Sequence, residues 1–96
     1  MILTDLIGEP AILEQLAEEA AELNHASLKL ARILRGENPT PVRRKVAVEH
    51  LTEEMTDIFV CIAVLAQAGY EIDPELAEQK IRRWYTRVLR ERGAGE

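Results

Sequence analysis

The chain has 96 residues, carries a formal net charge of −5, and 30% of its residues are charged. This length suits one small domain over residues 1–96, near the size at which a single core is only marginally sufficient. The composition fits a soluble protein and argues against nucleic acid as a partner, and no stretch reaches the roughly 18–20 apolar residues that a membrane span needs. No basic region precedes the first apolar residues and Cys61 is the only cysteine, so we expect no secretory signal, no internal disulfide and a cytoplasmic location.

The first long helix is predicted over residues 11–35. Residues 1–8 are a short lead-in with one expected helical turn from Thr4 or Asp5. Gly8 followed by Pro10 indicates that this turn ends and that a new helix begins. Apolar residues then recur at helical spacing and form one stripe. Its members are Ile12, Leu16, Leu23, Leu30 and Leu34, with the small residues Ala20, Ala26 and Ser27 beside it.

A turn over residues 36–41 separates the first long helix from the second. Gly36 suits a helix end, and two prolines follow that forbid continuation of the helix. The second helix is predicted to begin at Pro41 or Val42 and to reach Ala68, with Gly69 as its C-terminal stop.

A third helix is predicted from Asp73-Pro74 to about residue 92, because an acidic cap followed by proline marks a helix start. Residues 93–96 should form a frayed tail. The apolar side of the third helix comprises Ala77, Ile81, Trp84, Val88 and Leu89. A basic stripe beside that side comprises Lys80, Arg83, Arg87 and Arg90. No strand pattern occurs, so the predicted fold class is all-α.

The second helix also predicts a partner subunit. Residues 58–68 are apolar at every position except Gln67, so the helix needs cover on more than one side. Three helices of one chain are too few to supply it. We therefore expect a helical bundle completed by homodimerisation, as a dimer or a dimer of dimers.

Several carboxylates point toward the faces that should be buried. On the helical wheel Glu54 falls among Leu51, Ile58 and Cys61, and Asp57 lies beside it. In the first helix Glu19 lies in the middle of the apolar stripe. Glu22 falls on its border and Glu18 on the polar side. An ionised carboxylate in such a place costs several kcal/mol unless a cation meets it.

The two pairs, Glu19 with Glu22 and Glu54 with Asp57, lie on helices joined by a short turn, so they should face each other. Four carboxylates without a sulfur or imidazole set predict a hard-cation site for Mg²⁺ or Mn²⁺. Magnesium held in this way keeps open positions for substrate phosphates, and the basic stripe could neutralise the remaining phosphate charge. Together these features suggest phosphoanhydride hydrolysis.

The sequence E-E-A-A-E at residues 18–22, followed by E-M-T-D at residues 54–57, resembles the EExxE…ExxD signature of the MazG-like, all-α nucleoside triphosphate pyrophosphohydrolases. The resemblance covers almost the whole chain. It implies a Mg²⁺-dependent enzyme that cleaves a nucleoside triphosphate to the monophosphate and pyrophosphate, in nucleotide-pool housekeeping.

The resemblance also implies roles for individual residues. The metal ligands would be Glu19, Glu22, Glu54 and Asp57. Glu18 would bind a second metal or orient the attacking water, alone or with a neighbouring acid such as Glu19. Lys80 and Arg83 match the K-x-x-R that contacts phosphates, whereas Glu78 stands where many relatives have asparagine.

Three other interpretations fit parts of the pattern. The acids could form a solvated face paired with arginines of the third helix. Glu22 and His25 form an E-x-x-H, the spacing of di-iron and di-manganese carboxylate bundles. In the third interpretation the chain is a non-catalytic helical dimerisation module. This interpretation predicts that Glu19→Ala and Asp57→Ala leave function intact and raise stability.

Overall fold

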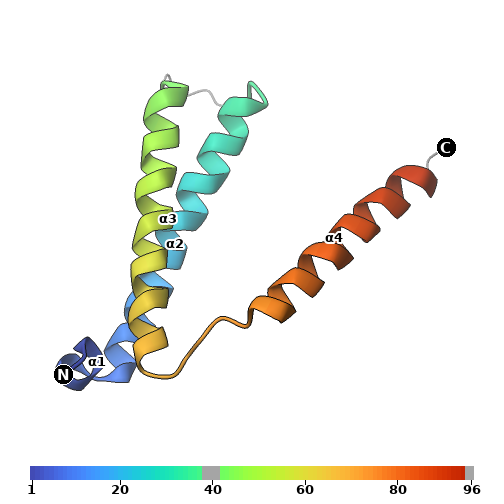
Figure 1. Ribbon diagram of the computed structural model, residues 1–96. Coiled ribbons are helices and arrows are strands. Elements are labelled where there is room, and N and C mark those ends of the chain that lie inside the picture. The colour runs from blue at the N-terminus through green and yellow to red at the C-terminus, as the bar shows by residue number, and fades with distance from the viewer. Residues whose placement is uncertain (38–41, 95–96) are drawn as a thin grey trace.

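The computed structural model describes residues 1–37 and 42–94, and these residues contain helices and no strand. The helices are α1 (Leu3–Ile7), α2 (Glu9–Leu34), α3 (Arg44–Gln67) and α4 (Pro74–Ala94). Figure 1 shows them in chain order from blue to red. The prediction of an all-α fold is confirmed.

Glycines follow the C-terminal ends of α2 and α3, as the sequence indicates. Gly36 has φ 73° and Gly69 has φ 97°, a backbone conformation that side chains with a Cβ rarely adopt. At each site two backbone N–H groups turn back onto the last helical carbonyls: Gly36 donates to Ile33 and Glu37 to Arg32, with the same pattern from Gly69 and Tyr70 after α3. These bonds satisfy carbonyls that a helix end would leave without partners.

Three boundaries of the long helices differ from the prediction by two residues or more. Helix α2 begins at Glu9 rather than residue 11, because Gly8 with φ 88° already breaks the chain from α1. Helix α3 begins at Arg44 because Arg43 is extended, and the alternative start at Pro41 lies outside the described residues. Helix α4 continues to Ala94, so residues 93–94 are helical rather than a frayed tail; residues 95–96 are not described.

Helices α2 and α3 run antiparallel and pack along each other, and the short α1 folds against both (Figure 1). The buried apolar residues all come from this pair: Ile12, Ala26, Ala47, Cys61 and Leu65. Of the predicted α2 stripe, Leu16, Leu23 and Leu30 are half-buried, whereas Leu34 is exposed. Two small alanines in this contact let the helix backbones approach closely. None of the described helices is both long and apolar enough to span a bilayer.

Helix α4 stands apart from the rest of the chain. Its start is well defined, since the Asp73 carboxylate accepts a hydrogen bond of 3.0 Å from the Leu76 backbone N–H. Within the described residues, however, α4 contacts none of the other helices, and it projects away from them in Figure 1. The chain is correspondingly extended, with a radius of gyration of 17.6 Å. The predicted homodimer stays a prediction.

Candidate metal centre

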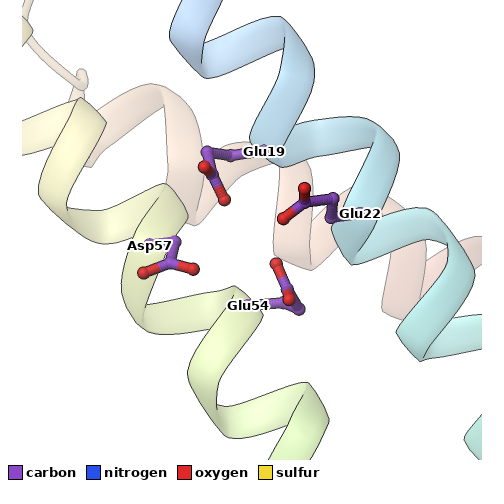
Figure 2. A group of neighbouring side chains, drawn as sticks. All are labelled: Glu19, Glu22, Glu54 and Asp57. Atoms are coloured by element: carbon purple, nitrogen blue, oxygen red, sulfur yellow. The ribbon is translucent and has the colours of Figure 1, made fainter.

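The four carboxylates predicted as metal ligands converge between α2 and α3. Each offers an oxygen, and these oxygens all lie within 4.8 Å of one another. Figure 2 shows Glu19 and Glu22 on one helix pointing toward Glu54 and Asp57 on its neighbour. The spacing of three residues within each pair places both carboxylates on one helix face, and the antiparallel packing brings the two faces together.

Burial is graded across this cluster. Glu54 lies deepest, with 6% of its surface exposed. Glu19 and Asp57 are half-buried, whereas Glu22 is exposed. The cluster is therefore closed on the Glu54 side and open on the Glu22 side, where a ligand could enter from solvent.

Each of the two inward glutamates, Glu19 and Glu54, has a polar side chain from the preceding helical turn close to one of its oxygens. Gln15 Nε2 donates a hydrogen bond of 2.8 Å to Glu19 Oε1. His50 Nε2 lies 3.5 Å from Glu54 Oε1. The second oxygens, Glu19 Oε2 and Glu54 Oε2, are shielded from solvent and have no hydrogen-bond partner. Such oxygens are rare in proteins because leaving them unpaired is costly.

The electrostatics of the cluster favour a cation. Burial, and then the nearby carboxylates of Glu22 and Asp57, raise the pKa of Glu19, while the Gln15 hydrogen bond opposes this increase. No lysine or arginine among residues 1–37 and 42–94 forms an ion pair with any of the four acids. The interpretation in which arginines of the third helix neutralise them is therefore not what the structure shows.

The chemistry of the donors selects the type of cation. Carboxylate oxygens suit hard divalent ions. Cys61 is buried beside the cluster, and desolvation followed by the charges of Glu19 and Asp57 raises the pKa of its thiol. Cys61 does not belong to the cluster, whose ligand atoms are carboxylate oxygens only. The donor set is thus suited to a hard ion.

The spacing also fits one ion. Oxygens on opposite sides of Mg²⁺ lie about 4.2 Å apart, because each ligand sits roughly 2.1 Å from the metal. The observed spread of up to 4.8 Å would close on such an ion through small side-chain rotations. Four protein oxygens do not fill six positions, so water or a substrate would complete the coordination.

The remaining predicted site residues lie elsewhere. Glu18 is exposed on α2, next to Glu19 in sequence but outside the four-residue cluster. Lys80 and Arg83 are exposed on α4, which has no contact with α2 or α3 of the same chain. The structure therefore unites the predicted metal ligands and leaves the predicted phosphate contacts apart.

The contacts of Gln15 and His50 with the inward glutamates were not predicted from the sequence. Each lies four residues before the glutamate that it approaches, which is the spacing of side-chain neighbours on a helix. That spacing was the available signal. It is weak by itself because many polar pairs share it.

The di-iron interpretation relied on His25, which is exposed and does not belong to the cluster. The only histidine near the cluster is His50 among the described residues, and it lies on the α3 side, beside Glu54. The geometry thus gives the E-x-x-H motif no support.

Comparisons with known proteins add no identification. No protein-family model matches the chain, and searches of curated proteins and of solved structures found no match either. The resemblance to MazG-like enzymes consequently rests on the residues of the two acidic motifs.

Proposed function

We propose that the chain is a Mg²⁺-dependent nucleoside triphosphate pyrophosphohydrolase of the MazG-like type. The observation that supports it best is the pair of shielded, unpartnered oxygens, Glu19 Oε2 and Glu54 Oε2, within the four-carboxylate cluster. A divalent cation would give both oxygens a partner and would relieve the repulsion among the four acids. Manganese would fit the same ligands.

The open side of the cluster favours a phosphorylated substrate. Glu22 is the exposed member, so unfilled metal positions would face solvent on its side. Bound Mg²⁺ supplies Lewis acidity that polarises phosphoryl oxygens and makes a bound water more acidic. A substrate with adjacent phosphates can chelate an ion held in this way, which suits a nucleoside triphosphate.

The chain's own residues have defined tasks in this proposal. Glu54, Asp57, Glu19 and Glu22 hold the cation, and Gln15 and His50 orient the two inward glutamates. Glu18, alone or with Glu19, accepts a proton from the attacking water. The water oxygen forms a bond to phosphorus while the bridging bond between the α and β phosphates breaks, so the products are a nucleoside monophosphate and pyrophosphate. Lys80 and Arg83 would neutralise the phosphate charge only where α4 lies near a cluster, which it does not do within its own chain.

A product assay tests the proposal. Purified protein is incubated with Mg²⁺ and each common or damaged NTP and dNTP, and released pyrophosphate and orthophosphate are measured separately. We expect pyrophosphate from at least one nucleotide and loss of turnover in EDTA. Metal binding confirmed by titration, with no pyrophosphate from any nucleotide, would contradict the enzyme and favour the non-catalytic dimerisation module.

A further inference from the structure

Helix α2 keeps one cationic side chain, Lys29, half-buried. Among residues 1–37 and 42–94 it is the only lysine or arginine that is not exposed, and it takes part in no ion pair within that part of the chain. Partial burial of a charge costs free energy unless an opposite charge meets it. Lys29 therefore lacks an anion in the same way that Glu19 Oε2 and Glu54 Oε2 lack a cation.

Lys29 lies on the same edge of α2 as the open side of the cluster. It follows Glu22, the exposed member of the cluster, by seven residues. The two side chains therefore leave the helix within about 20° of one direction and about 10.5 Å apart along its axis. Ala26, between them in the sequence, is buried where α2 packs on α3. This edge of α2 thus borders the contact between the two helices.

A lysine at this position can reach a ligand of the bound metal. Side chains of a helix lean toward its N-terminus, so a stem at residue 29 leans back toward Glu22. The extended stem covers roughly one helical turn, which leaves a gap of about one further turn before the cluster. That gap agrees with the absence of an ion pair between Lys29 and Glu22. A chain of phosphates held by the metal would span it.

The charge pattern of the hairpin directs an anion toward Lys29. Residues 23–48, the half of the hairpin beyond the cluster, carry six Lys or Arg and one Glu, a net charge of +5. Residues 1–22 and 49–73 together carry twelve Asp or Glu and no Lys or Arg, a net charge of −12. A phosphate chain on the metal is therefore repelled from one end of the hairpin and attracted toward the other.

The other cations of the basic half are farther from the cluster or leave their helix on another side. On α2, Arg32 lies about one turn farther from Glu22 and is exposed. On α3, Lys45 precedes Glu54 by nine residues, so its side chain leaves the helix on the opposite side. The remaining arginines of this half lie still farther along each helix. Lys29 is thus the cation best placed to meet an anion on the metal.

We propose that Lys29 binds the phosphate chain of the substrate beyond the metal, from the same hairpin that carries the four carboxylates. The assignment rests on the proposed function, because it takes the substrate to be a triphosphate. It gives the phosphates a cation within the hairpin, where α4 of the same chain supplies none.

Titration calorimetry with inorganic tripolyphosphate in excess Mg²⁺ tests the assignment, because this probe carries the phosphates without a base or sugar. Lys29→Met keeps the apolar stem and removes the charge, so the affinity for tripolyphosphate should fall about 10–100-fold, as is usual for hydrogen bonds to charged groups. Lys29→Arg keeps the charge and should bind within a few-fold of the wild type. Lys45→Met removes the same charge from the opposite side of α3 and should bind as the wild type does.

Titration of the same variants with Mn²⁺ separates binding of the phosphates from binding of the metal. Lys29 is not a metal ligand, so Lys29→Met should bind Mn²⁺ within a few-fold of the wild type and keep its helical circular dichroism. Unchanged affinity of Lys29→Met for tripolyphosphate would overturn the assignment. Equal losses in Lys29→Met and Lys45→Met would do the same, and so would a loss of Mn²⁺ affinity as large as the loss of tripolyphosphate affinity.

The outcomes also separate the assignment from the proposed function. Pyrophosphate release by the wild type, with no effect of Lys29→Met on tripolyphosphate affinity, refutes the assignment alone. Weaker tripolyphosphate binding by Lys29→Met, in a protein that releases no pyrophosphate, supports phosphate binding by Lys29 and contradicts the enzyme. A wild type that binds Mn²⁺ but not tripolyphosphate contradicts both.

Discussion

The α2–α3 hairpin and helix α4 break the usual rule of burial in opposite directions. The hairpin buries carboxylates, with Glu54 only 6% exposed, whereas α4 exposes its apolar residues, with Trp84 63% exposed. Each departure costs free energy in an isolated chain. We expect a different component to relieve each: a divalent cation for the hairpin, as proposed above, and a second copy of the chain for α4, as the sequence predicts.

The largest expected effect comes from removing the deepest carboxylate of the hairpin. Glu54→Gln keeps the shape and removes a ligand charge, so pyrophosphate release should fall on the order of 10³-fold, because a metal supplies several kcal/mol of transition-state stabilisation. Glu53→Gln, at the exposed neighbouring position, is the matched control and should retain activity. Equal losses in both variants would show that the cluster is not the site.

The next effect concerns the residues that approach the inward glutamates. Gln15→Ala and His50→Ala should each weaken Mn²⁺ binding by about 10–100-fold, as is usual for groups that orient metal ligands. Titration calorimetry measures this directly. Glu14→Ala and Glu49→Ala alter exposed residues adjacent to each position and should bind Mn²⁺ within a few-fold of the wild type. Unchanged affinity in Gln15→Ala would mean that its hydrogen bond does not orient the ligand.

A third prediction uses pH to separate the metal-free hairpin from the metal-bound one. The pKa of Glu19 is raised above its ordinary value of 4.5, first by burial and then by Glu22 and Asp57. This group therefore contributes stability that is present below pH 4.5 and is lost as the pH rises through its elevated folded-state pKa.

In EDTA, the melting temperature of Glu19→Gln minus that of the wild type should consequently grow as the pH rises from 4.5 toward neutrality. Saturating Mg²⁺ should reverse the sign near neutral pH, because the metal stabilises only the wild-type ligand set. A difference that is independent of pH in EDTA would contradict the buried, crowded carboxylate.

The smallest effect concerns how α4 begins. Asp73→Ala removes the hydrogen bond to the Leu76 N–H and should cost about 1 kcal/mol of helix stability, whereas Asp73→Asn should cost less. Urea unfolding followed by circular dichroism and by Trp84 fluorescence measures it. If α4 packs on other helices in the predicted homodimer, both signals should shift together; a shift in helicity alone would indicate that α4 is not packed.

The sequence predicted the hairpin and its carboxylates well because both depend on local periodicity. The helical repeat fixed the inward direction of Glu19 and Glu54, and glycines at 36 and 69 fixed the two helix ends. The side-chain contacts of Gln15 and His50 were not predicted, since whether such a pair forms depends on how deeply the glutamate is buried.

The placement of α4 relative to other helices could not be predicted from local periodicity. Periodicity identified Lys80, Arg83 and the apolar face correctly as neighbours on one helix, but it says nothing about which surface that helix meets. That choice depends on tertiary and quaternary packing across the segment between Gly69 and Asp73. The boundary errors at Arg44 and Ala94 have a related cause, because helix ends are set by a few backbone groups rather than by a repeat.

The separation of α4 from the hairpin has a kinetic consequence. Contacts between α2 and α3 close a short loop, so the hairpin should form quickly and at a rate independent of protein concentration. In the predicted homodimer, packing of α4 on a second copy would be a bimolecular step. During refolding, most helical circular dichroism should thus recover first, and the Trp84 signal should follow at a rate that increases with the amount of protein present.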